Sequence, residues 1–154
     1  MIRFLAICSA LAALALGSCV SQQATLTDGL AWSYQNNEGE GPKLTYGAPM
    51  SDNVVMMMTC EQPGVATVSL LGGSPQGGLI LASNGKPTRF GGQFVAAPGM
   101  GHMIETSAAL DSQPLARFQR TGDLTLVDRG RTVEIDAKGN ERKQVMRFFE
   151  ACEA

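Results

Sequence analysis

The chain has few of the residues that carry catalysis or bind metals. Its 154 residues include a single histidine, His102, and four cysteines. A protein zinc site takes about four nitrogen, sulfur or oxygen ligands, and a serine-type hydrolase needs a base beside its nucleophile. No Gly-x-Ser-x-Gly sequence accompanies His102. We therefore expect no enzyme activity, no metal and no cofactor. We interpret His102 as a partly exposed strand residue and keep a general base as the enzyme alternative.

The chain also lacks a concentrated basic segment. Lysine and arginine number 12 against 14 acidic residues, for a net charge of −2. A mildly acidic chain without a basic block argues against nucleic acid as a partner. Basic residues do gather after residue 115. We interpret them as solvated faces of two helices and a hairpin, with a patch facing anionic lipid or peptidoglycan as the alternative.

Long apolar runs are missing after Leu16. The run from Phe4 to Leu16 follows Arg3, the only charged residue before Asp28. A charged start followed by a short apolar run is typical of a secretory signal. A membrane-spanning helix would need about 20 apolar residues, so this run is too short to be one.

The sequence Leu16-Gly17-Ser18-Cys19 ends the apolar run. It resembles the lipobox of bacterial lipoproteins: an aliphatic residue, two small residues and a cysteine. The resemblance implies that residues 1–18 are a cleaved signal peptide and that Cys19 carries lipid. Two or three acyl chains would anchor the chain stably to a membrane. By analogy with enterobacterial lipoproteins, Val20 favours the outer membrane, facing the periplasm. An ordinary secretory signal, or an inner-membrane location, is the alternative.

The lipobox simplifies the cysteine count. Cys8 lies in the signal and Cys19 would take the lipid, which leaves Cys60 and Cys152. Two remaining cysteines in an oxidising periplasm are expected to form a disulfide. Two free buried thiols are the alternative.

Turn-forming residues are abundant, with 18 glycines and seven prolines. We predict a tether over residues 19–29 and a single, mostly β domain over residues 30–154. The fold class is mainly β: an antiparallel sandwich or barrel-like domain of about eight short strands with one or two helices. The predicted strands cover residues 30–35, 43–46, 53–61, 65–71, 79–82, 88–96, 102–107, 123–127 and 132–136.

Both predicted helices lie late in the chain. Residues 113–120 form the first, with Asp111 or Ser112 as its cap and Gly122 as its stop. Residues 140–152 form an amphipathic C-terminal helix capped by Asn140. Residues 36–42 and 72–78 are predicted loops.

Three other patterns have simpler explanations than chemistry. The run Met56-Met57-Met58 could bind copper, but adjacent strand residues point to opposite faces, which favours core packing. Glu38 and Glu40 are interpreted as a solvated acidic loop rather than a calcium site. The glycine pair at residues 91–92 reads as a turn, because no Walker-type lysine follows it.

The remaining resemblance concerns Trp32, Cys60 and the C-terminal sequence ending at Cys152. It is similar to uncharacterised small envelope proteins of Gram-negative bacteria, and it implies no activity. We therefore expect a membrane-anchored envelope protein with a non-catalytic binding or structural role. Its partner would be an envelope protein or peptidoglycan. The alternative is an inhibitor of an envelope hydrolase, like the small lipoprotein inhibitors of lysozyme, whose serine-glycine and tyrosine motif is absent here.

Overall fold

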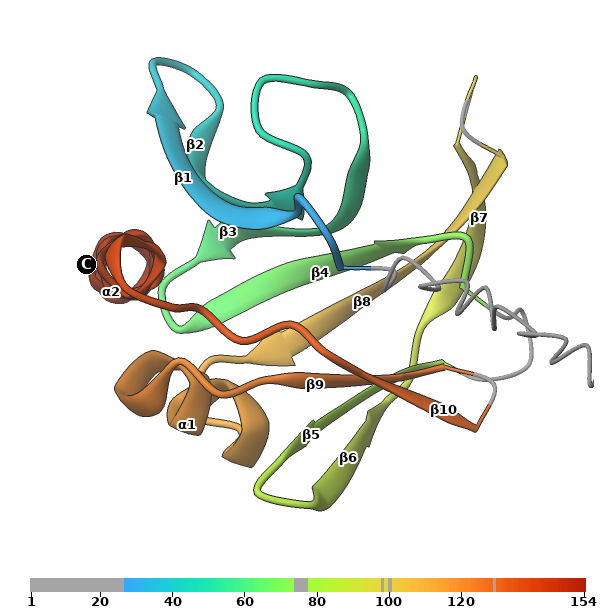
Figure 1. Ribbon diagram of the computed structural model, residues 1–154. Coiled ribbons are helices and arrows are strands. Elements are labelled where there is room, and N and C mark those ends of the chain that lie inside the picture. The colour runs from blue at the N-terminus through green and yellow to red at the C-terminus, as the bar shows by residue number, and fades with distance from the viewer. Residues whose placement is uncertain (1–26, 74–77, 98, 100, 129) are drawn as a thin grey trace, which may run out of the picture.

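The computed structural model describes residues 27–73, 78–97, 99, 101–128 and 130–154. They form ten antiparallel strands in two sheets, together with two helices (Figure 1). The mainly β prediction with a C-terminal helix is confirmed, and the sheets do not close into a barrel. The elements are β1 Ala31–Asn37, β2 Gly41–Gly47, β3 Val54–Gln62, β4 Val65–Leu71, β5 Leu79–Ser83, β6 Lys86–Phe90, β7 Gln93–Ala97, β8 Gly101–Ala109, α1 Gln113–Thr121, β9 Thr125–Asp128, β10 Arg131–Glu134 and α2 Asn140–Glu153.

The larger sheet has the strand order β1-β2-β3-β4-β8-β7, and the smaller sheet has the order β10-β9-β5-β6. In the larger sheet β3 lies between β2 and β4, with Met58 opposite Leu44 on one side and Val68 on the other. All three side chains are fully buried. The prediction that residues 53–61 form a central strand follows from their apolar pattern and is confirmed.

A shared hydrophobic core joins the two sheets and the helices. Helix α2 packs against β1 and β2, and α1 packs against α2 and β5. Trp32 on β1 contacts the rings of Tyr46 and Phe118 in this core. Its indole Nε1 donates a hydrogen bond to the carbonyl oxygen of Ile135 at 2.6 Å. Because a buried N–H without a partner is costly, this bond fixes the segment before α2 to the edge strand.

One predicted loop and one predicted strand are wrong in their extent. The loop predicted over residues 36–42 covers only residues 38–40, because β1 and β2 pair as far as Asn37 opposite Gly41. Residues 88–96 are not one strand, because β6 and β7 belong to different sheets. The chain changes sheets at Gly91 and Gly92. A Cβ on Gly92 would lie 2.7 Å from the side chain of Ile104, so only glycine fits this close crossing.

The turn predicted over residues 84–87 is shorter in the structure, because Lys86 and Pro87 already belong to β6. Asn84 and Gly85 have left-handed φ angles, 51° and 71°, and they join β5 to β6 with Ser83 opposite Lys86. This is the backbone that a two-residue hairpin requires, and Asn-Gly adopts it most readily.

The helix caps differ from the sequence prediction. Ser112 occupies the N-cap of α1, but its side chain makes no capping hydrogen bond. Gly122 ends α1 in the left-handed conformation, as predicted. Helix α2 begins at Asn140 with Gly139 at the N-cap, so Asn140 is the first helical residue rather than the cap. Within the described ranges, neither helix is long and apolar enough to cross a membrane.

Candidate functional site

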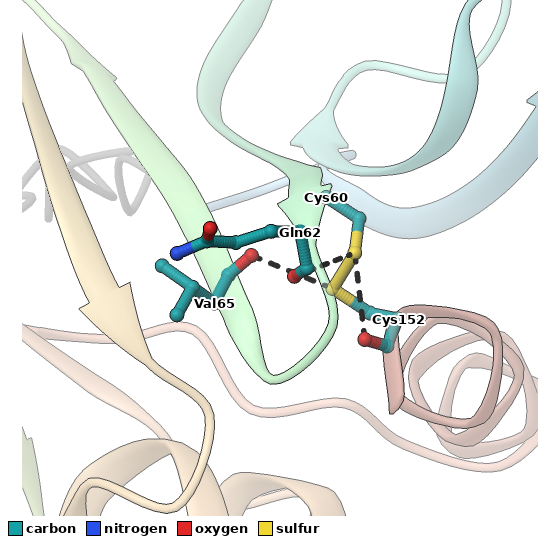
Figure 2. The surroundings of a disulfide bond; sticks show 4 residues. All are labelled: Cys60, Gln62, Val65 and Cys152. Atoms are coloured by element: carbon teal, nitrogen blue, oxygen red, sulfur yellow. Dashed lines mark hydrogen bonds between the residues drawn. A yellow bond between two sulfur atoms is a disulfide. The ribbon is translucent and has the colours of Figure 1, made fainter. Parts of the chain in front are cut away.

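Cys60 on β3 and Cys152 on α2 form a disulfide, as predicted. Their Cα atoms are 5.5 Å apart, within the range that an unforced bridge needs. Figure 2 shows the bridge between the end of β3 and the last turn of α2, with Gln62 and Val65 beside it. The Sγ atom of Cys60 lies 3.7 Å from the Gln62 carbonyl oxygen, and that of Cys152 lies 3.7 Å from the Val65 carbonyl oxygen. Neither sulfur carries a proton, so these are close contacts.

The turn between β3 and β4 is held from two sides. Gly64 donates its N–H to the carbonyl oxygen of Cys152 at 2.9 Å, and its own carbonyl accepts from the N–H of Leu110 at 2.9 Å. These bonds tie the turn to the last turn of α2 and to the residue after β8. Together with the disulfide, they hold this end of the larger sheet rigidly in place.

A β-bulge beside the disulfide positions Glu61. Cys60 pairs with Ala66 and Gln62 pairs with Val65, which leaves Glu61 as the extra residue of β3. Bulges re-aim the side chains that they carry. Here Glu61 lies directly after a cysteine that is covalently fixed to α2.

The face of the larger sheet that points away from the core carries polar side chains. One row across the sheet comprises Thr59, Thr67 and Ser107, which are opposite one another on β3, β4 and β8. The next row places Glu105 between Ser69 and Gln93. These residues alternate along their strands with core residues such as Ala66 and Val68, which are fully buried.

An open cleft of about 500 Å³ lies on this outer face, over β3, β4, β8 and β7. We call it the outer-face cleft. Its lining is polar and consists of Glu61, Thr67, Gly91, Gly92, Gln93, Glu105, Thr106 and Ser107. Thr106 donates its hydroxyl to the carbonyl oxygen of Gly91. That bond fixes the glycine pair against β8, where it forms one wall of the cleft.

The lining of the outer-face cleft combines two carboxylates with hydroxyl and amide groups that can donate and accept hydrogen bonds. Glu61 and Glu105 supply carboxylates, and no lysine, arginine or histidine belongs to the lining. Ion pairs within the described residues join Lys43 to Glu40 and Arg117 to Asp123, and neither cleft carboxylate takes part in one. The cleft therefore carries negative charge that nearby protein cations leave uncompensated.

Thr67 is a polar residue buried at the floor of the cleft. Its exposed fraction is 7%, and its hydroxyl makes no hydrogen bond to another described residue. The buried polar side-chain atoms without a partner in the described ranges are Ser112 Oγ and Arg117 Nε, so the Thr67 hydroxyl is not sealed from solvent. It is therefore accessible to a molecule in the cleft.

The residues considered in the sequence for chemistry lie elsewhere. His102 is exposed at the start of β8, where its ring stacks on Phe94 with centroids 4.7 Å apart. Met56 and Met58 are fully buried in the core, whereas Met57 is half-buried on the outer face, so the methionine run is split as predicted. Cys19 and the rest of the lipobox lie outside the described residues.

The acidic turn between β1 and β2 is solvated. Glu40 forms an ion pair with Lys43 at 3.2 Å and accepts a longer hydrogen bond from Asn37. The hydrogen bond from Lys43, followed by that from Asn37, lowers the pKa of this carboxyl below its ordinary value. Across the described ranges, no three histidine, cysteine, aspartate or glutamate side chains are grouped as metal ligands.

Sequence analysis missed the outer-face cleft. A usable signal was present: hydroxyl residues alternate with apolar ones around Thr67. Alternation alone predicts only a solvated face, however, because strand order decides which hydroxyls become neighbours. Compared with protein-family models, curated proteins and solved structures, the chain matches none of them.

Proposed function

We propose that this protein is a lipid-anchored protein of the bacterial cell envelope with a non-catalytic binding role. The outer-face cleft is its binding surface, facing the periplasm. The observation that carries the binding role is the cleft itself: a polar hollow of about 500 Å³ lined by two carboxylates outside any ion pair among the described residues and by Thr67, which is 7% exposed. Its volume falls within the range of small-molecule sites.

The anchor rests on the lipobox and on the chemistry of the remaining cysteines. The disulfide between Cys60 and Cys152 suits an oxidising compartment outside the cytoplasm. The first described residue is Thr27. The segment from Cys19 to Thr27 would span at most about 28 Å when extended, which would keep the β sheets close to the membrane.

Cell fractionation of two cysteine variants tests the anchor. The unaltered chain should sediment with membranes, and Cys19→Ala should release it or leave it as an unprocessed precursor. Cys8→Ala is the matched control, because it removes a cysteine from the same apolar segment without touching the lipid-bearing position. Membrane association of Cys19→Ala equal to that of the unaltered chain would contradict the proposal.

A second candidate function is inhibition of an envelope hydrolase, and the loop over residues 48–53 favours it. Met50 is fully exposed, with a φ of 56° that residues other than glycine rarely adopt. The loop is held by a backbone hydrogen bond from Ala48 to Asn53 at 2.8 Å and by the hydroxyl of Ser51, which donates to the Ala48 carbonyl. A rigid loop that presents an apolar side chain is suited to fill a pocket on another protein.

An assay of cell-wall lysis by lysozyme tests this second function. The unaltered chain should slow the lysis of bacterial cell walls by lysozyme, and Met50→Glu should abolish the effect. Met146→Glu is the control, because Met146 is also exposed but lies on α2. If the unaltered chain leaves lysozyme fully active, lysozyme is excluded as its target.

A further inference from the structure

We propose that the outer-face cleft binds an elongated small molecule that carries two ammonium groups, such as a polyamine or an amino-sugar disaccharide. This rests on the proposed binding role and names the class of ligand. It does not depend on the lipid anchor at Cys19.

The two carboxylates come from different strands and different rows of the larger sheet. Glu61 is on β3 and Glu105 is on β8, with β4 between them. Glu105 pairs with Ser69, whereas Glu61 lies beside the pairs at Ala66 and Val65, more than three residues further along β4. Strand spacing and rise then place the two backbone positions roughly 15 Å apart. Carboxylates on backbone positions so far apart are suited to two separate cations.

Hydrogen-bonding groups also line the cleft. Thr67 and Ser107 are directly opposite each other on β4 and β8. Both line the cleft, and the hydroxyl of Thr67 makes no hydrogen bond to another described residue. Their hydroxyls can accept from N–H groups or exchange hydrogen bonds with sugar hydroxyls. This part of the cleft therefore favours a polar ligand over a hydrocarbon.

The number of carboxylates in the cleft favours this ligand over a bound metal. Calcium needs six to eight oxygen ligands at about 2.3–2.6 Å, and the lining supplies only two carboxylates. The described residues hold no cluster of three acidic or metal-binding side chains at this place. Ammonium groups require only one carboxylate each, and each pair forms charge-assisted hydrogen bonds.

Ligand titrations followed by NMR on the untruncated, purified protein test the proposal. Four probes are compared: spermidine, the disaccharide of glucosamine, its fully N-acetylated form and calcium chloride. Spermidine and the glucosamine disaccharide both carry ammonium groups. The one that binds more tightly shows whether the natural ligand resembles a polyamine or an amino sugar. N-acetylation removes the charge but keeps the sugar, so the acetylated disaccharide should bind at least tenfold more weakly.

Three variants localise the binding. Glu61→Gln and Glu105→Gln should each weaken the binding of the tighter-binding amine about fivefold, because each removes one partly exposed ion pair. Thr67→Val should weaken it by a similar factor without changing any charge. Glu38→Gln is the control, because Glu38 is an exposed carboxylate in the turn between β1 and β2. Thermal unfolding checks that every variant is folded.

Several outcomes would overturn the proposed ligand. These are equal binding of the acetylated and free disaccharides, displacement of the amines by millimolar calcium, or unchanged affinity in both glutamate variants. Failure of both amines to bind would also overturn it. If the protein still fractionates with membranes through Cys19 in that case, the ligand class alone fails and the envelope anchor stands.

Discussion

The two faces of the larger sheet differ in chemistry although the same strands form both. On β4, Ala66 and Val68 point into the core, while Thr67 and Ser69 point to the outer face. All four side chains are buried, with exposed fractions between 0% and 7%. The inner pair is surrounded by apolar side chains, and burying apolar surface stabilises the fold. The outer pair buries hydroxyls, which adds little stability.

We expect the inner face to contribute mainly to stability and the outer face mainly to binding. Ser69 is flanked in its row by the longer side chains of Met57 and Glu105, which cover it. A sheet face selected only for solubility would carry exposed charged residues over a flat surface. The outer face instead encloses hydroxyls next to unpaired carboxylates, in a hollow that a ligand can enter. Variants that alter one face at a time can test this contrast.

The largest expected effect is on the inner face. Met58→Ala should lower the free energy of unfolding by about 2–5 kcal/mol, because Met58 is fully buried and its removal leaves a cavity. Met57→Ala, on the half-buried outer face, should cost about 1 kcal/mol or less. Urea unfolding curves measure both. Equal losses would mean that the two faces contribute alike to stability.

The second effect concerns the bridge that joins the sheet to α2. Replacing both Cys60 and Cys152 with serine should lower the free energy of unfolding by about 2–4 kcal/mol, because the bridge closes a loop between cysteines 92 residues apart. Thermal unfolding with and without reductant measures the loss in the unaltered chain. A midpoint that reductant leaves unchanged, after thiol labelling proves reduction, would contradict this expectation.

A reciprocal exchange on β4 gives a smaller effect and compares the faces directly. Val68→Thr should destabilise by about 1–3 kcal/mol, because it places a hydroxyl in the apolar core. Thr67→Val should change stability by about 0.5 kcal/mol or less, because the hydroxyl that it removes has no partner among the described residues. Chemical unfolding of the two variants side by side checks the difference. Similar losses would show that the Thr67 hydroxyl stabilises the fold.

The smallest expected effect appears at high pH. Burial, and then the carboxylates of Glu141 and Asp136, raise the pKa of Tyr46 above its ordinary value. The folded state therefore holds this proton more tightly than the unfolded state does. The resulting stability is complete below about pH 10 and is lost as the pH rises through the raised pKa. Unfolding between pH 8 and 11 should show this loss in the unaltered chain, and Tyr46→Phe should show less of it.

Local patterns were sufficient for most of the strands and for both helices. The apolar residues around Met57 predicted a central strand, and the helical spacing of apolar residues predicted the C-terminal helix. These predictions succeed because side-chain periodicity acts over a few residues. Residues 88–96 were misread as one strand because the close contact between Gly92 and Ile104 is a tertiary feature.

The cysteine count and the alternation around Met57 were determined by the sequence itself. They identified Cys60 and Cys152 as a pair and separated Met56 and Met58 from Met57. The tertiary structure alone decided that Glu61, Thr67 and Glu105 share one cleft. The physical reason is that β8 pairs with β4 across a long stretch of chain, and a bulge beside the disulfide turns Glu61 toward them. No local pattern specifies either of these arrangements.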